Sequence, residues 1–142
     1  MDLNGMIERY HAALDEFSRG DPEPVKTIFS HRDDVTLANP FGPAVRGWQT
    51  ATSALDYASS RFRGGSAKTF ERIASFISAD LATIHETERW NFKFAGSEEI
   101  STVDLRVTST FRREDGEWRL VHRHADPIAT ADPRGPLRNS GN

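Results

Sequence analysis

The C-terminal half of the chain alternates polar and apolar residues over long segments, which is the pattern of strands that bury one face. The predicted strands span residues 68–77, 81–94, 100–113 and 117–126. Asp115-Gly116 separates the last two, and this dipeptide favours a tight two-residue hairpin. Long consecutive strands joined by hairpins predict an antiparallel sheet.

The N-terminal half predicts helices. Apolar residues recur at helical spacing over residues 6–17, 25–29 and 48–62. Gly20 and the pair Gly64-Gly65 stand where the first and third helices are expected to end. A short run at 35–38 predicts one further strand, which the prolines of residues 39–43 prevent from continuing. Helices followed by a strand meander indicate an α+β fold, with three helices packed on a mostly antiparallel sheet.

Length and composition limit the possible classes of protein. The chain has 142 residues, 37% of them hydrophobic, which suffices for one domain with a buried core. We expect this domain at residues 1–127 and an extended or disordered tail at 128–142. The net charge of −3 argues against nucleic acid and acidic membranes as partners. The lack of cysteine excludes thiolate chemistry, and the lack of a leader or long apolar run predicts a cytoplasmic protein without membrane contact.

Alternation assigns an inward face to each long strand. The inward set of the strand at 81–94 is Ala82, Ile84, Glu86, Glu88, Trp90, Phe92 and Phe94. The inward sets of the last two strands are Val103, Leu105, Val107, Ser109 and Phe111, and Trp118, Leu120, His122, His124 and Asp126. With Asp115-Gly116 central in the loop, Phe111 opposes Leu120 and Ser109 opposes His122. The longer loop before residue 100 allows a slip by two, and the preferred pairing sets Glu86 beside Ser109.

Glu86, Glu88, His122 and His124 form the most informative group of side chains. In the functional interpretation, Glu86 and His122 transfer a proton at the base of an apolar cavity, and His124 orients them or acts as an acid. Burial raises the pKa of a glutamate and lowers that of a histidine, while their attraction opposes both shifts, so one group can titrate near neutral pH. The alternative is a buried ion pair with a structural role alone.

Two other arrangements use the same residues. His122 and His124, with Glu86 or Glu88 as a third ligand, are suited in chemistry to zinc or ferrous iron, but their spacing along one strand is unfavourable. A Ser109–His122–Asp126 triad lacks the sharp turn that presents a nucleophilic serine. We therefore expect no metal and no other cofactor.

Several short motifs follow one another in a recognisable order. They are Arg9-Tyr10-His11-Ala12-Ala13-Leu14, Gly20-Asp21, Asp33-Asp34-Val35-Thr36, Asn39-Pro40-Phe41-Gly42 and the final run from Trp118 to Asp126. Together they resemble the nuclear-transport-factor-2-like (NTF2-like) superfamily, which includes ketosteroid isomerases, SnoaL-like polyketide cyclases and DUF4440 proteins. The resemblance covers about residues 5–127. It implies a cone of helices over a strongly curved sheet, with a pocket inside.

The same resemblance implies a homodimer through the outer face of the sheet. The arginines predicted on that face are Arg89, Arg106, Arg112, Arg119 and Arg123. We interpret them as a solvated surface, which such a dimer would turn into a polar interface. Their presence does not indicate RNA binding, because the net charge is negative and no surface aromatic residues are interleaved with them.

The ketosteroid isomerases provide a test of one activity, which needs a carboxylate base and two hydrogen-bond donors. The resemblance puts the tyrosine donor at Tyr10, the base at Asn39 and the acidic donor at Ser109. An amide has no useful basicity, so steroid isomerisation by that mechanism is rejected.

Two classes of function follow. The first is an enzyme that moves a proton on a small, largely apolar molecule with a polar group, ketone-like or polyketide-like, with Glu86 or His122 as the base. The second is a non-catalytic ligand-binding or dimeric association module. The predicted ligand contacts are Tyr10, Asn39, Trp48, Phe62, Glu88, Trp90, Ser109 and Asp126.

Overall fold

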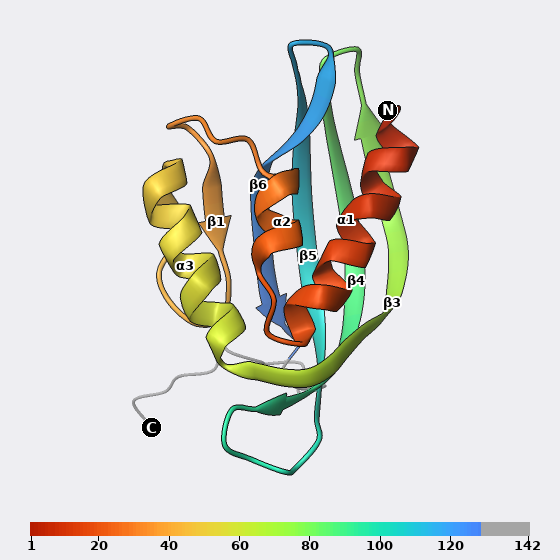
Figure 1. Ribbon diagram of the computed structural model, residues 1–142. Helices are drawn as coiled ribbons and strands as arrows, with labels where there is room; N and C mark the ends of the chain where they lie inside the picture. Colours follow the sequence, from red (N-terminus) through yellow and green to blue (C-terminus); the bar gives the residue numbers. More distant parts are fainter. Residues whose placement is uncertain (129–142) are drawn as a thin grey trace, which may run out of the picture.

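Three helices cover one face of a six-stranded sheet in the part of the chain that the structure describes (Figure 1). This computed structural model describes residues 1–128, except the side chains of Ala67 and Lys68, so the predicted tail after Ile128 lies outside the described residues. The helices are α1 (Leu3–Ser18), α2 (Glu23–Ile28) and α3 (Trp48–Ser60). None of these three is long and apolar enough to cross a lipid bilayer.

The sheet has the strand order β2-β1-β6-β5-β4-β3. Its strands are β1 (Thr36–Ala38), β2 (Val45–Arg46), β3 (Phe62–Ile77), β4 (Leu81–Phe94), β5 (Ser101–Glu114) and β6 (Glu117–Pro127). Neighbouring strands are antiparallel except β1 and β6, which run parallel. The predicted α+β architecture and meander are confirmed, while the two-residue strand β2 was not predicted.

The first helix follows its sequence pattern closely. Its apolar stripe, including Tyr10, Leu14 and Phe17, is buried. Asp2 caps the helix by accepting a hydrogen bond at 2.8 Å from the Gly5 N–H. Gly20 follows with a φ of +96°, and a Cβ at this position would lie 2.8 Å from the carbonyl oxygen of Phe62. Glycine is therefore required where α1 turns toward α2.

The third helix is shorter than predicted, because β3 begins at Phe62. The predicted stop at Gly64-Gly65 instead lies inside β3, where a Cβ on Gly65 would lie 2.7 Å from the carbonyl oxygen of Asn91. Gly65 allows β3 to pass close to the backbone of β4 at Asn91 and of α1 at Ser18. Three register shifts between β3 and β4 mark bulges or irregularities, and β3 curves around the lower end of α1 (Figure 1).

The hairpin between β5 and β6 forms as predicted at its tip. Asp115 and Gly116 both have positive φ, and Phe111 pairs with Leu120. The next pair along the ladder is Thr110 with His122, so Val121 is an extra residue in β6. A bulge of this kind reverses the faces of all residues beyond it.

The prediction that His122, His124 and Asp126 point inward is therefore wrong. Ser109 pairs with Arg123, not with His122, and Val107 pairs with Ala125, not with His124. Arg123 and Ala125 are buried on the inner face.

The pairing of β4 with β5 differs from the preferred register by two residues. Ser109 pairs with Ile84, and Glu86 pairs with Val107. This is the slip that the longer loop allowed. A shift by two keeps every side chain on its predicted face, so Glu86 and Glu88 are buried on the inner face as expected.

Candidate functional site

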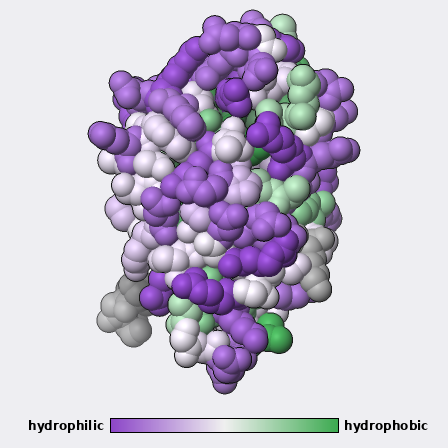
Figure 2. Space-filling view, in the orientation of Figure 1, coloured by the Kyte–Doolittle hydropathy of each residue, from purple (hydrophilic) through white to green (hydrophobic). Residues whose placement is uncertain are grey.

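A cavity of about 240 Å³ lies between the helices and the inner face of the sheet. Side chains from all three helices and from strands β1, β3, β4, β5 and β6 line it. Its walls are almost entirely apolar, and the described residues that bring hydrogen-bonding side chains to it are Asn39, Trp90 and Arg123. The surface over the helices is instead mainly hydrophilic (Figure 2). On this side of the molecule, the apolar lining lies beneath a mainly hydrophilic surface.

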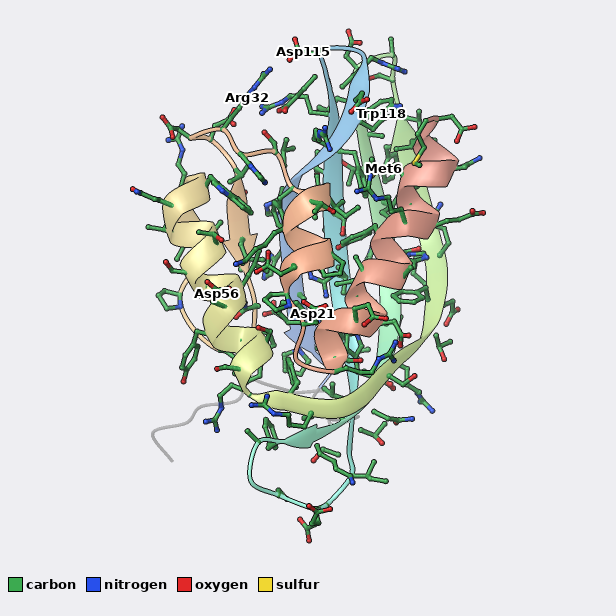
Figure 3. The ribbon with its side chains drawn as sticks, viewed as in Figure 1. Met6, Asp21, Arg32, Asp56, Asp115 and Trp118 are labelled. Atoms are coloured by element: carbon green, nitrogen blue, oxygen red, sulfur yellow. The ribbon has the colours of Figure 1, made fainter. Side chains whose placement is uncertain are left out.

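The cavity occupies one end of the molecule. The last residues of β4 and β6 and the first residue of β3 line it, and these strand ends lie together at the bottom of Figure 1. Met6 and Trp118, labelled at the other end in Figure 3, belong to the packed core. Lys26 Nζ of α2 lies 2.6 Å from Asp56 Oδ1 of α3, labelled in Figure 3, and links two helices that cover the cavity.

A buried hydrogen-bonded network adjoins the cavity. Arg123 donates from Nη1 to Glu88 Oε2 at 2.9 Å and from Nη2 to Glu88 Oε1 at 2.8 Å. Arg123 Nη1 also donates to the Tyr10 hydroxyl at 2.6 Å, and this hydroxyl is hydrogen-bonded to Ser109 Oγ at 2.7 Å. Trp90 Nε1–H donates to Glu88 Oε1 at 3.0 Å. The network therefore joins α1, β4, β5 and β6 on the inner face.

The charged members of this network are removed from water. Glu88 is 0% exposed and Arg123 is 6% exposed. Burial lowers the pKa of Arg123, but the charge of Glu88 and the hydrogen bonds from Arg123 outweigh burial, so the net shift is upward. Burial raises the pKa of Tyr10 to about 12, so its hydroxyl stays protonated at physiological pH. The two-pronged ion pair places a fixed cation at the cavity wall.

Tyr10, Glu88, Trp90 and Ser109 were all predicted as ligand contacts, and the structure brings them together with Arg123. Sequence analysis missed Arg123 because strict alternation put it on the outer face. A signal for the bulge exists in the adjacent residues Leu120 and Val121. Both are apolar and both are buried, which an unbroken alternation does not permit.

Glu86 has other partners than the predicted one. Its Oε1 is 2.7 Å from His11 Nε2, and its Oε2 accepts from Arg72 Nε at 3.1 Å. The His11 ring stacks on Phe70 with centroids 3.8 Å apart. Burial raises the pKa of Glu86, but the hydrogen bonds and charges of His11 and Arg72 outweigh it and lower the pKa overall.

The predicted pairing of Glu86 with His122 is therefore wrong. Glu86, His11 and Arg72 do not line the cavity. His11 lies one turn after the buried residue Ile7 on α1. This helical spacing is a sequence signal that indicates a position for His11 near the sheet.

The two histidines of β6 lie on the face of the sheet away from the cavity. His122 Nδ1 is 2.7 Å from Thr36 Oγ1, and His124 Nε2 is 2.8 Å from Asp126 Oδ2. Burial, and then the charge of His124, lower the pKa of His122. Because Ser109 points inward and His122 outward, Ser109, His122 and Asp126 do not form a triad. The same separation from Glu86 rules out the shared metal site, and no group of three such ligands occurs among residues 1–128.

Of the other residues predicted to contact a ligand, some line the cavity and one lies outside it. Phe62 and Trp90 line the cavity, as expected. Asn39 also lines it, while its Oδ1 accepts from the Phe41 N–H at 2.9 Å and braces the turn after β1. Trp48 does not line it, because its ring stacks on His31 with centroids 4.0 Å apart at the start of α3.

The family model described as SnoaL-like domain matches residues 4–130. The chain belongs to the SnoaL-like domain family. A comparison with curated proteins found no match. The resemblance drawn from the short motifs is confirmed, since this family and the solved structures below lie within the NTF2-like superfamily.

Solved structures share the fold of this SnoaL-like protein. An NTF2-like superfamily protein from Salmonella enterica is 20% identical, with a TM-score of 0.73 and 89% of each chain covered. A ketosteroid isomerase-like protein from Erwinia carotovora is 17% identical, with a TM-score of 0.69, and 90% of this chain and 95% of that chain are covered. A candidate dehydratase of the NTF2-like family from Streptomyces avermitilis is 18% identical, with a TM-score of 0.71 and coverages of 90% and 94%. At these identities the shared property is the fold.

The chemistry open to this SnoaL-like cavity follows from its lining. No carboxylate or imidazole of residues 1–128 lines it, and both oxygens of the nearby Glu88 are bound by Arg123 and Trp90. The cavity is lined by apolar surface together with Arg123, Asn39 and Trp90, and the Trp90 N–H is engaged by Glu88. Such a site can enclose an apolar molecule and direct N–H groups at its polar atom.

Proposed function

We propose that this SnoaL-like protein binds a compact, largely apolar small molecule in the cavity. The observation that carries the proposal is a largely apolar cavity beside a buried ion pair. Small-molecule sites usually measure about 300–1,000 Å³, so a cavity of about 240 Å³ suits a ligand below drug size.

Proton transfer on this ligand is a second candidate function. The names of two structural neighbours, a candidate dehydratase and a ketosteroid isomerase-like protein, are consistent with it. Arg123 supports it further, because a fixed cation stabilises negative charge that develops on a ligand oxygen. Such a reaction also needs a base, and the described lining supplies none. Ligand binding without a base in the wall is therefore the primary proposal.

Calorimetric titration with tetralin and 1-tetralone, two compact bicyclic molecules, tests binding in this cavity. Ala58 lies on α3 in the cavity wall, and Ala58→Phe is expected to fill the space and weaken binding at least about tenfold. Ser53→Phe, on the exposed side of the same helix, is the matched control and should bind as wild type does. Failure of wild type to bind either compound, or equal binding by Ala58→Phe, would refute the proposal.

We also propose that two copies associate through the outer face of the sheet. Phe76 and Leu81 on this face are 69% and 50% exposed. Glu71, Thr87 and Arg106 form a row across it, so that opposite charges meet when two copies pack in antiparallel orientation. Light scattering should give twice the chain mass for wild type and a monomer for Phe76→Glu. A monomeric wild type would contradict this proposal without affecting the cavity.

A further inference from the structure

We propose that the cavity selects an electrically neutral ligand with a hydrogen-bond acceptor, such as a ketone, ester or lactone oxygen, that receives N–H groups of Arg123 and Asn39. This inference rests on the proposed binding of a small molecule in the cavity. It adds the chemical class of that molecule. The hydrogen-bond donors and the charges at the cavity wall indicate this class.

Arg123 has donors to spare. A guanidinium carries five N–H bonds, and three of those in Arg123 are used by Glu88 and Tyr10. The other two, on Nε and Nη2, have no partner among the described residues and lie along the same edge of the planar group. No fully buried side-chain nitrogen in the described part of the chain lacks a partner, so Nε must border open space. The open space that Arg123 borders is the cavity.

Asn39 adds donors of the same kind. Its Oδ1 is engaged by the Phe41 N–H, which fixes the orientation of the amide. Its Nδ2 group, with two N–H bonds, has no partner in residues 1–128, and Asn39 lines the cavity. Leu37 of β1 pairs with Arg123 of β6, and Asn39 lies two residues after Leu37, in the turn that follows β1. Donors therefore line one cavity from β6 and from the turn after the strand beside it.

The charge count of the wall favours a neutral ligand. The cation of Arg123 is matched by the Glu88 carboxylate at 2.8 Å, so the ion pair beside the cavity carries no net charge. An anionic ligand would add an unbalanced charge to an apolar enclosure, and desolvation opposes this. A cationic ligand would meet no free carboxylate there. A neutral acceptor satisfies the unused N–H groups without either penalty.

Four bicyclic probes of similar size test this inference by calorimetry. They are tetralin, 1-tetralone, tetralin-1-carboxylate and 1-aminotetralin. We expect wild type to bind 1-tetralone about tenfold more tightly than tetralin, as one hydrogen bond from a charged donor predicts. The carboxylate and the amine should each bind at least about tenfold more weakly than 1-tetralone.

A paired substitution removes the donor without leaving an unmatched charge. Glu88→Gln with Arg123→Met keeps an acceptor for the Trp90 N–H and should lower the preference for 1-tetralone over tetralin to about twofold or less. Arg106→Met, on the outer face of the adjacent strand, is the matched control and should keep the full preference. Asn39→Asp keeps the turn acceptor while replacing the N–H groups, and should also weaken 1-tetralone more than tetralin.

One measurement needs no variant. The infrared carbonyl stretch of 1-tetralone bound to wild type should lie below its value in hydrocarbon solvent, because a hydrogen bond weakens the C=O bond. A stretch at the hydrocarbon value, equal binding of tetralin and 1-tetralone, or tightest binding of the carboxylate would each overturn the inference. If tetralin and 1-tetralone bind equally and Ala58→Phe abolishes the binding of both, the proposed function stands and only this inference fails. If wild type binds none of the four probes, the proposed function and this inference both fail.

Discussion

Arg123→Met removes the cation that both oxygens of Glu88 bind and leaves that carboxylate 0% exposed, with the Trp90 N–H as its remaining partner. The same change takes a hydrogen bond from the Tyr10 hydroxyl. Breaking a buried ion pair from one side typically lowers the free energy of unfolding by about 3–5 kcal/mol, because desolvation of the remaining charge is no longer compensated. For a domain of this size, the melting temperature should fall by roughly 10–20 °C.

Urea-induced unfolding followed by circular dichroism measures this loss directly. The double variant Glu88→Gln with Arg123→Met removes both charges, and we expect it to stay within about 2 kcal/mol of wild type. The contrast between the single and double variants separates the unmatched charge from ordinary loss of packing. A single variant as stable as wild type, with an unchanged urea dependence, would show that Glu88 and Arg123 are not a desolvated pair.

Three further predictions concern other parts of the network and the fold. Tyr10→Phe removes the hydroxyl that bonds Ser109 and Arg123, and urea unfolding should record a loss of about 1–2 kcal/mol; no loss would mean that this hydroxyl contributes nothing net. Glu86 has a folded-state pKa below its ordinary value of 4.5, so its stabilising contribution is complete above pH 4.5 and is lost as pH falls through the folded-state pKa. Unfolding measured between pH 3 and 6 should therefore depend less on pH in Glu86→Gln than in wild type, and identical slopes would argue against this role. Gly65→Ala brings a Cβ to 2.7 Å from the Asn91 carbonyl oxygen and should lower stability by about 1–3 kcal/mol, whereas a neutral effect would contradict the close approach of β3.

The sequence predicted some residues of the cavity wall correctly and assigned one residue to the wall wrongly. Phe62 and Trp90 were recognised as cavity residues, although Phe62 belongs to β3 and not to the third helix. Asn39 combines the two roles considered for it, because one end of its amide braces a turn and the other end faces the cavity. Trp48 was assigned to the cavity from its helical stripe, yet stacking on His31 holds its ring elsewhere. A stripe on a helix indicates burial without saying which neighbour it is buried against.

The polar site was misassigned at one point in the chain. Val121 is an extra residue in β6, and it reverses the faces of His122 and Arg123. Beside the bulge, the carbonyl oxygen of Leu120 accepts a hydrogen bond at 2.8 Å from the Ser30 N–H, in the segment after α2. This contact joins residues far apart in sequence, so residues 117–126 do not report it, although the adjacent apolar residues Leu120 and Val121 are a local sign of the bulge.

The sequence by itself determined the three helices and the four long strands, though not every boundary, because helical and strand periodicities and the Asp115-Gly116 turn are local properties of the chain. It also determined the family, through the order of short motifs along the chain. Only the tertiary structure decided which charges meet: Arg123 with Glu88, and His11 with Glu86. These pairs depend on a one-residue bulge and a two-residue register shift, and both are set by packing between distant segments. Which side chains meet across the sheet therefore depends on the whole fold, even where each strand can be predicted from its own residues.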